Sequence, residues 1–449
     1  MSFEPQKEEQ KFEIILGREE PDRKKFGARG TILLGKHYVK MAQITSLSQP
    51  VFLDLNKAHI MFVCGKRGSG KSYTLGVVAE GIANLPQELS QKISVILFDT
   101  MGIYWTMKYP NHKDDALLRD WGVEGKGISA VKIYTPFGFF KSYKEQGIPT
   151  DSPFSIKPSE LAPQDWNLTF DLTINDPIAV FIERVILSLR KSGRDYDIED
   201  ILLAIRADLK EDVHIRNASE NRFLSAQSWG VFRKESTPLR DLIQGGQITV
   251  IDLSCYASMP NGWKIKTLVT GIVCGRIFIE RMIARKNEEF AAINSAVHFI
   301  ASEEFKSELP MVWVMLDEAH EFLPKDATTP ASDALITLLR EGRQPGIAML
   351  LSTQQPGKIH TDAMTQSDIV LAHRLTAKID TDALGSLLQS YLKGSLDLEL
   401  ANLPRVAGAC IVVDDVNERV YPMRVRPRFS WHGGSAPAII TDEKKPFEF

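Results

Sequence analysis

The feature that most constrains this chain is the octet GKRGSGKS at residues 65–72, which follows the apolar run HIMFVC and precedes a helical pattern. The octet matches G-x-x-x-x-G-K-[ST], in which the glycines let successive backbone N–H groups turn inward around an anion. The helix that follows presents the positive end of its dipole to the same anion. A strand, this loop and a helix in succession predict a site for a nucleoside triphosphate.

The residues of this loop are expected to hold different parts of the ligand. Lys71 can reach the β- and γ-phosphates, and the Ser72 hydroxyl can hold Mg²⁺, which keeps several waters and takes few protein oxygens. ATP and Mg²⁺ are therefore the expected ligands. The expected nucleotide-binding residues are Gly65, Lys66, Arg67, Gly68, Ser69, Gly70, Lys71, Ser72 and Tyr73.

Strands alternate with helices along most of the chain, which predicts an α/β fold with a mainly parallel sheet and helices on both faces. Apolar runs such as KISVILFDT and QITVIDLS are typical of strands that are buried on both faces. The predicted division of the chain is a flexible N-terminal arm (1–28), a short, reduced N-terminal β element (29–58), an ATPase core (59–137 and 246–430), a helical insertion (138–245) and a C-terminal tail (431–449).

Composition limits the cellular setting and the partners. No apolar run approaches the ~20 residues needed to cross a bilayer, and the polar N-terminus is unlike a signal peptide. The four cysteines are far apart in apolar contexts, so buried thiols are expected rather than disulfides or metal ligands. The sequence therefore predicts a cytoplasmic protein without a membrane partner. A net charge of −3 means that nucleic acid would need a locally basic groove.

A second motif, VWVMLDEAH, places Asp317 at the carboxyl end of a predicted buried strand, where ligands bind in open α/β sheets. Asp317 is expected to hold Mg²⁺ through water, and Glu318 to polarise the water that attacks the γ-phosphate. The next predicted strand ends in LLSTQQP, which makes Gln354 the candidate sensor of the γ-phosphate. The sequence therefore predicts hydrolysis in addition to binding.

Two arginines lie between these strands, in LLREGRQPG. Arg340 and Arg343 end a predicted helix, where the dipole favours cations in any case. In the functional interpretation, one of them is an arginine finger that reaches the nucleotide of a neighbouring subunit. Both are candidate catalytic residues, and Arg343 is favoured.

The order of these motifs, followed by DIVLAHRL, resembles the HerA branch of the HerA/FtsK superfamily of RecA-fold ATPases, which form rings and pump double-stranded DNA. The resemblance covers roughly residues 50–430 and is strong only at the motifs. It implies a RecA-like core, a homo-oligomeric ring with six subunits as the expected number, and double-stranded DNA as the partner. It assigns phosphate and Mg²⁺ to Lys71 and Ser72, metal and water to Asp317 and Glu318, the sensor to Gln354 and the finger to Arg343. The segment RVRPRFSWHGG also resembles the family's C-terminal segment.

The sequence departs from the family pattern in two places. The family usually has D-x-x-G-E-Y after its second strand, and here DTMGIYW has Ile103 in place of the glutamate. Family members also begin with a β-barrel that docks a nuclease, and the segment before residue 59 is too short for a barrel of that size. A nuclease partner is therefore a weaker inference than the motor.

Basic loops of a ring channel would contact DNA phosphates, and the candidates are Lys325 in LPKDATTPAS and Lys358 and His360 in QQPGKIHTDAM. The sequence leaves open an alternative, a nucleotide-dependent switch ATPase that recruits or regulates a nuclease or defence effector without processive movement. A third class, the secretion or conjugation ATPases, shares the core but would usually carry a membrane anchor.

Overall fold

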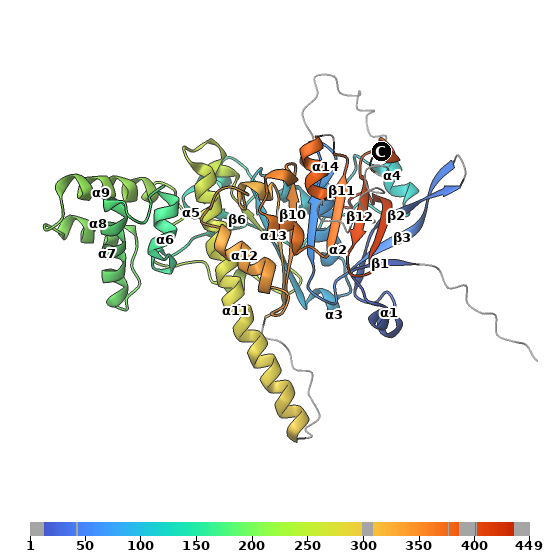
Figure 1. The fold of residues 1–449 in the computed structure, drawn as a ribbon, viewed down its shortest axis with the longest axis horizontal. Coiled ribbons are helices and arrows are strands. Elements are labelled where there is room, and N and C mark those ends of the chain that lie inside the picture. The colour runs from blue at the N-terminus through green and yellow to red at the C-terminus, as the bar shows by residue number, and fades with distance from the viewer. Residues whose placement is uncertain are drawn as a thin grey trace, which may run out of the picture.

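A mixed sheet of thirteen strands runs through the described part of the chain (Figure 1). The structure is a computed structural model that describes residues 13–41, 44–298, 309–375, 377–385, 400 and 402–434. From one edge to the other, the strands are β1 (Ile14–Leu16), β3 (Ile44–Asp54), β2 (Thr31–Met41), β13 (Arg419–Val425), β12 (Ala409–Asp414), β11 (Ile369–His373), β4 (Ile60–Cys64), β10 (Ile347–Thr353), β9 (Met311–Leu316), β5 (Ile93–Asp99), β8 (Ile248–Asp252), β6 (Val131–Pro136) and β7 (Ser152–Phe154).

The strands from β11 across to β7 are all parallel to their neighbours. β12 and β13 add an antiparallel hairpin at the edge of this block. Antiparallel β2 and β3 extend the same sheet through β13, so the N-terminal β element belongs to the main sheet. The predicted α/β fold with a mainly parallel sheet is confirmed.

Helices cover both faces of the sheet, and β4 shows why. Ile60 and Phe62 belong to one apolar core, which includes residues of α11 (Gly262–His298) and α12 (Ser332–Glu341). Met61 and Val63 belong to the other core, which includes residues of α2 (Lys71–Ala83). Successive side chains of a strand point to opposite faces, so an uninterrupted apolar run is the pattern of a strand buried on both sides.

The prediction of a flexible arm over residues 1–28 is wrong for its described part. β1 pairs in parallel with β3, and α1 (Glu20–Phe26) follows it. Ile14, Ile15 and Leu16 are buried, which supplies the apolar contacts that an arm would lack.

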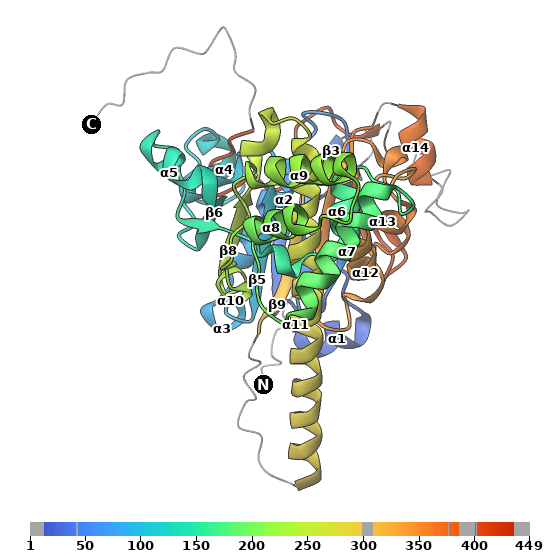
Figure 2. The same cartoon turned by 90° about the vertical axis from the view of Figure 1, so that its left-hand side faces the viewer.

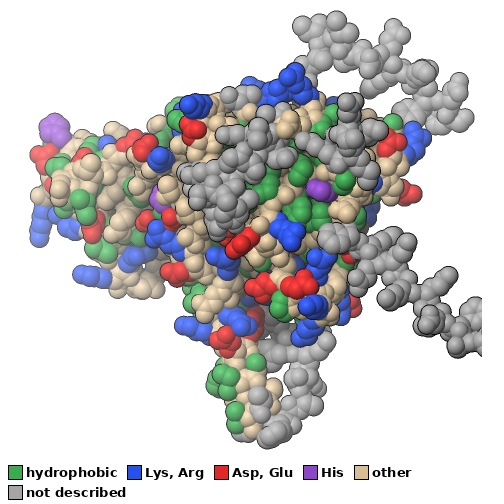
Figure 3. Space-filling model, turned by 45° about the vertical axis from the view of Figure 1, so that its right-hand side comes forward, with side chains coloured by type: hydrophobic (Ala, Val, Ile, Leu, Met, Phe, Trp, Pro, Cys, Tyr) green, Lys and Arg blue, Asp and Glu red, His purple; other side chains and the backbone are tan. Residues whose placement is uncertain are grey.

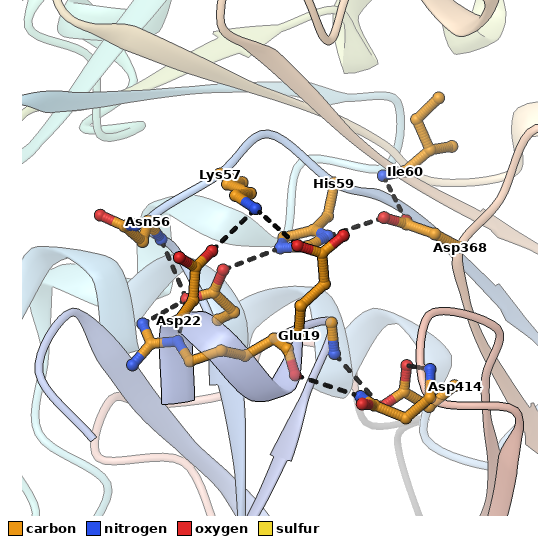
Figure 4. A network of polar contacts seen from close by, with 12 residues as sticks. Glu19, Asp22, Asn56, Lys57, His59, Ile60, Asp368 and Asp414 are labelled. Carbon is orange, nitrogen blue, oxygen red and sulfur yellow. Dashed lines mark hydrogen bonds and ion pairs between the residues drawn. The ribbon is translucent and has the colours of Figure 1, made fainter. Parts of the chain in front are cut away.

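A buried ionic network fastens this N-terminal segment to the core (Figure 4). Nε of Arg18 donates to Asp54 Oδ1 at 2.9 Å. His59 directly precedes β4, and its Nε2 lies 3.2 Å from Asp54 Oδ2 while its Nδ1 lies 2.7 Å from Asp368 Oδ2. Burial alone would lower the pKa of His59, but its hydrogen bonds with Asp368 and Asp54 raise it to about 9. His59 is therefore a buried imidazolium between two carboxylates, one at the end of β3 and one directly before β11.

Residues 138–245 are mainly helical, as the sequence predicts, but they also contain β7, which pairs with β6 and lengthens the parallel sheet. Figures 1 and 2 show α7, α8 and α9 grouped at one end of the molecule, away from the sheet. Asp176, Asp197 and Asp212 cap these three helices by accepting N–H groups of the first turn. The helices of this region are α5 (Phe137–Glu145), α6 (Pro163–Thr169), α7 (Pro177–Lys191), α8 (Ile198–Ala207), α9 (Val213–Gln227) and α10 (Leu239–Leu242).

Helix α11 begins against the sheet, and its C-terminal half projects from the body (Figure 2). None of the helices in the described ranges is both long and apolar enough to span a membrane. The remaining helical segments are α3 (Gln87–Ser90), α4 (Asp115–Asp120), α13 (Thr361–Thr365), α14 (Lys378–Gly385), η1 (Tyr104–Lys108), η2 (Pro158–Glu160), η3 (Ser254–Ser258), η4 (Ala319–Glu321) and η5 (Pro356–Lys358).

Candidate nucleotide-binding site

The glycine-rich loop joins β4 to α2 at the carboxyl edge of the parallel strands. Gly68 and Gly70 have φ angles of 75° and 114°, a left-handed region that favours glycine. A Cβ on Gly65 would lie 2.5 Å from Ser69 Oγ and 2.6 Å from His373 Cβ, so close packing also requires glycine there. Lys71 is 6% exposed, and its ammonium donates to the carbonyl of Lys66 at 3.3 Å. The loop is therefore a tight turn at the N-terminus of a helix, the geometry that binds anions.

His373 supports this loop from β11. Its Nε2 lies 3.0 Å from Thr74 Oγ1, and its Nδ1 lies 3.2 Å from the carbonyl of Ala409. Complete burial lowers the pKa of His373 to about 4. The ring is therefore neutral at pH 7 and packs beneath the loop without adding charge.

Asp317 follows β9 directly, and three donors hold its carboxylate. Ser352 Oγ and the Glu318 N–H donate to Oδ1 at 2.8 and 3.0 Å, and the Tyr104 hydroxyl donates to Oδ2 at 3.1 Å. Asp317 is 4% exposed. Oxygen ligands fixed in this way suit Mg²⁺, for which Ser72 supplies a second oxygen close by in the same pocket.

Glu318 has an uncommon backbone conformation, with φ 52° and ψ 45°. A residue with a Cβ pays a steric cost in this left-handed region, and such strain is concentrated at functional sites. Burial, and next the neighbouring charge of Asp317, raise the pKa of Glu318 to about 7. Its buried Oε2 accepts no hydrogen bond from the described residues. Glu318 is thus a carboxylate with a proton affinity that suits a general base near neutral pH.

His320 lies beside Glu318, with Nδ1 3.5 Å from Glu318 Oε2 and 3.0 Å from Thr353 Oγ1. Burial, and next the charge of Lys358, lower the pKa of His320. The ring is therefore neutral at pH 7, so the short distance to Glu318 is not a charged pair. His320 links the strand end that carries Glu318 to the strand end that precedes Gln354.

One pocket of about 570 Å³ contains most of the predicted site residues. Arg67, Gly68 and Gly70 through Tyr73 line it together with Asp317, Glu318 and Gln354. Gly65, Lys66 and Ser69 belong to the loop but do not line the pocket. The structure thus brings together the ends of β4, β9 and β10, which are far apart in sequence.

The two candidate arginine fingers do not line this pocket. Arg340 donates through Nε to Asp362 at 2.6 Å, so the side chain is already paired on its own subunit. Arg343 is exposed, and no described residue forms a hydrogen bond or ion pair with its guanidinium. Arg343 precedes β10, which is 7 residues long and therefore spans ~20 Å. Only the far end of this strand, next to Gln354, reaches the pocket. Arg343 therefore cannot reach the nucleotide site of its own chain.

The candidate DNA-contacting loops pair with each other, through an isolated bridge between Pro324 and Ile359 and a hydrogen bond from the Lys325 N–H to the Lys358 carbonyl at 2.9 Å. Lys325 and Lys358 are exposed. His360 has a structural task that the sequence did not reveal, because its Nδ1 accepts the Asp362 N–H and caps α13. The two lysines share one loop surface, whereas the imidazole is turned toward its own helix.

Sequence reasoning missed the contribution of the C-terminal segment to the site. His432 and Gly434 line the pocket, together with residues 424–427. The segment continues beyond the predicted core boundary at residue 430 because Trp431 is held by η1 and the residue after it. Thr106 Oγ1 donates to the Trp431 carbonyl at 3.0 Å, and the Trp431 N–H donates to the Tyr109 carbonyl at 2.8 Å. One residue in the sequence could have pointed to this contribution: Glu80, a carboxylate within the apolar pattern of α2. Glu80 holds the C-terminal segment by accepting hydrogen bonds from Arg426 and Phe429.

The chain has recognisable relatives among known proteins. The chain is 28% identical over 142 residues to a probable DNA double-strand break repair helicase HerA of Methanocaldococcus jannaschii, an alignment covering 29% of this chain and 27% of the relative. It is 23% identical over 175 residues to the DNA double-strand break repair helicase HerA of Pyrococcus furiosus, covering 38% and 31% of the two chains. The matched regions therefore span less than a third of these relatives.

Among solved structures, VirB4 of Thermoanaerobacter pseudethanolicus superposes with a TM-score of 0.52 at 13% identity, covering 88% of this chain and 96% of that one. This likeness concerns the fold alone. The family described as "Helicase HerA, central domain" matches residues 34–272, a stretch that includes the glycine-rich loop and ends before Asp317. Since that match covers more than half of the 449 residues, the chain belongs to the HerA central-domain family.

Proposed function

We propose that this protein hydrolyses ATP and uses the free energy to move along double-stranded DNA as a ring of identical subunits, with each nucleotide bound between neighbours. The observation that carries the proposal is the meeting of the glycine-rich loop, Asp317 and Glu318 in one pocket. A phosphate-binding loop alone would fit a kinase or a switch. A carboxylate with a pKa of about 7 beside it fits a site that activates water.

In this mechanism, the N–H groups of the loop and the dipole of α2 bind the phosphates, and the Lys71 ammonium approaches the β- and γ-phosphates. Glu318 accepts a proton from the attacking water, and the Gln354 side chain orients that water. The residues fit Mg²⁺, since Ser72 and Asp317 offer hard oxygen ligands and a hexacoordinate Mg²⁺ keeps most of its waters. Mg²⁺ bound there would neutralise charge on the phosphate oxygens. Among the described residues, no cluster of three or more His, Cys, Asp or Glu side chains competes as a metal site.

The position of Arg343 supports the proposed ring. Its exposed guanidinium lies at the amino end of β10, opposite the pocket of its own subunit. In a ring with head-to-tail contacts, this edge of one subunit can face the pocket of the next. There Arg343 would stabilise charge that develops on the transferred phosphoryl group.

The proposed DNA contacts are local. Lys and Arg side chains are interspersed with Asp and Glu on the face shown in Figure 3, in keeping with a net charge of −3. The loops that carry Lys325 and Lys358 pair with each other, and they follow Glu318 and Gln354 of the pocket in the chain, which supports a DNA contact there. Movement of these loops during turnover would transmit the hydrolysis step to the DNA backbone.

The test is the ATPase rate with and without linear duplex DNA, with Glu318→Gln as the inactive control. Several-fold stimulation by duplex at low salt supports the motor, because phosphate contacts weaken as salt rises. Turnover that is the same with and without duplex contradicts it. That result would favour the alternative, a nucleotide-dependent switch that recruits or regulates a nuclease or defence effector.

A further inference from the structure

The pocket is longer than the phosphate-binding loop requires, and its two ends differ in chemistry. One end carries Asp317, Glu318 and Gln354, the groups proposed to act on the γ-phosphate. The lining also includes Tyr73, residues 424–427, His432 and Gly434 of the C-terminal segment, and residues from three other stretches: Met101 and Ile103, Asn111 to Leu117, and Ala407 and Gly408. A nucleotide whose γ-phosphate is at the first end must place its base and ribose at the second.

The C-terminal part of this second end is rigidly anchored. Glu80 of α2 is completely buried and accepts hydrogen bonds from Arg426 Nη1 at 2.6 Å and from the Phe429 N–H at 2.9 Å. Its other oxygen accepts the N–H and hydroxyl of Ser430 at 3.1 and 2.7 Å. A Cβ on Gly76 would lie 2.5 Å from the Arg428 guanidinium, so α2 has a glycine where the segment packs most closely. The helix that follows the phosphate-binding loop thus also fixes the segment that lines the far end of the pocket.

Two aromatic rings meet at this end. Tyr73 and His432 pack edge to face, with ring centroids 5.3 Å apart and an interplanar angle of 73°. The Tyr73 hydroxyl accepts the Arg428 N–H at 2.7 Å, which fixes the tyrosine ring. His432 Nδ1 lies 3.2 Å from Arg428 Nη1, and since arginine can only donate, this nitrogen of the imidazole is unprotonated.

The ring of His432 is therefore neutral. Burial, and next the charge of Arg428, lower the pKa of His432 to about 4. A neutral imidazole gives no electrostatic attraction to phosphate, so its place in an anion-binding pocket needs another explanation. A flat aromatic ring held in a fixed position is a surface on which a heterocyclic base can pack.

We infer that residues 426–434 form the wall of a base-binding subsite, in which the aromatic base of the bound nucleotide packs against Tyr73 and His432. The inference rests on the proposed function for the phosphate end of the pocket and extends it to the rest of the ligand. It makes the C-terminal segment part of the nucleotide site, although the sequence predicts only a tail after residue 430.

The test compares two ligands that share phosphates and differ in the base, Mg·ADP and Mg·pyrophosphate, by titration calorimetry on the full chain. We expect the wild type to bind ADP more tightly than pyrophosphate. His432→Ala should lower the affinity for ADP by about tenfold, because it removes one base–aromatic contact. The affinity for pyrophosphate should not change. His432→Phe, which retains a flat ring, should restore most of the ADP affinity.

Two controls separate this inference from its foundation. Trp431→Ala removes the neighbouring side chain, which is 38% exposed and does not line the pocket, so neither affinity should change. Lys71→Ala should lower the affinity for both ligands, because Lys71 is proposed to contact the phosphates that they share. Equal losses of ADP and pyrophosphate in His432→Ala would overturn the inference and leave the phosphate site intact. A wild type that binds neither ligand would overturn the proposed function and this inference with it.

Discussion

The phenolic oxygen of Tyr104 lies 3.1 Å from Oδ2 of Asp317 and 3.4 Å from the backbone oxygen of Ser72. One side chain thus joins the two motifs that supply the proposed Mg²⁺ ligands. Asp99 positions it by accepting the N–H groups of Gly102 and Tyr104 at 2.7 and 2.8 Å. The tyrosine of the D-x-x-G-E-Y pattern therefore has a task that does not depend on the glutamate, which is Ile103 here.

Tyr104→Phe removes this contact without changing the shape of the ring. We expect the ATPase rate to fall by about tenfold and the Mg²⁺ concentration for half-maximal rate to rise, because a hydrogen bond to a charged group contributes about 1.5 kcal/mol or more. Tyr109→Phe is the matched control, since Tyr109 is 51% exposed and does not line the pocket. An unchanged Mg²⁺ dependence in Tyr104→Phe would show that the hydroxyl does not position Asp317.

Glu318→Gln should abolish turnover and yet stabilise the fold at alkaline pH. The folded-state pKa of Glu318, about 7, is above its ordinary value of 4.5, so burying the charged form costs stability. That cost is absent below pH 4.5, grows between pH 4.5 and 7, and is fully present above pH 7. Its side chain is 23% exposed, so after discounting for solvent screening we expect a gain of roughly 1 to 2 kcal/mol at pH 8.

Thermal unfolding of wild type and Glu318→Gln at pH 4.5 and pH 8 measures this difference. Glu321→Gln, an exposed carboxylate nearby, is the control and should have little effect at either pH. Equal unfolding temperatures for Glu318→Gln and wild type at pH 8 would mean that Glu318 bears no such cost. In addition, kcat/KM of the wild type should rise with pH through about 7, as the general base of the free enzyme loses its proton.

The buried imidazolium of His59 predicts a loss of stability at alkaline pH. Between the unfolded-state pKa of 6.5 and the folded-state value of about 9, the folded protein holds a proton that the unfolded chain releases. The contribution is therefore fully present below pH 6.5 and is lost as pH rises through about 9. We expect a decrease of roughly 2 to 3 kcal/mol from this residue, given that a shift of one unit is about 1.4 kcal/mol.

Urea unfolding at pH 6.5 and pH 9.5 tests this, with His59→Gln as the variant that has no proton to lose. The variant should be less stable than wild type at pH 6.5 and should lose less stability on going to pH 9.5. Gly17 packs against this ring, since a Cβ there would lie 2.6 Å from His59 Cε1, so a larger residue than glutamine is unsuitable. Parallel pH profiles for the two proteins would argue against a charged His59.

Glu80→Ala should destabilise the protein severely. The carboxylate is completely buried and its removal leaves Arg426 and Arg428 without their shared anion, a loss of about 3 to 5 kcal/mol. Glu88→Gln is the control, because its ion pair with Arg29 joins side chains that are 67% and 70% exposed and should contribute less than about 1 kcal/mol. A loss from Glu80→Ala no larger than that of the control would contradict the anchoring role.

Subunit mixing tests whether the pocket is shared. Arg343→Ala and Lys71→Ala are each expected to be inactive as homogeneous rings. Mixed rings should recover hydrolysis at interfaces where an intact Lys71 meets an intact Arg343, and Arg340→Ala, whose side chain is paired with Asp362, serves as the matched arginine control. Mixed assemblies that form and yet stay inactive would contradict a finger acting between subunits.

Much of the site could be predicted because its parts are local patterns. The loop at residues 65–72 and Asp317 with Glu318 each follow an apolar strand, and parallel strands end at the same edge of a sheet, so their meeting follows from topology. The mainly parallel sheet could be predicted for the same reason. The pairing of β1 at the edge of the sheet could not be predicted, because its three residues are too few to show a strand pattern.

The contributions that the sequence concealed all depend on long-range contacts. Glu80 and Arg426 are 346 residues apart, and no periodicity or spacing connects them. The capping role of His360 and the pairing of Arg340 with Asp362 depend on where α13 begins relative to α12. His360 and Arg340 became functional candidates because their side-chain types suit DNA or phosphate, and the structure adds the contacts they make within their own chain.

If ATP hydrolysis moves this protein along DNA, the protein should displace a third strand from linear duplex DNA. A triplex-forming oligonucleotide is annealed at a site away from the duplex end, and its release is followed with ATP present. The wild type should release the third strand, and Glu318→Gln should not. Sustained ATP hydrolysis by the wild type with the third strand still bound would show that hydrolysis does not drive movement along DNA.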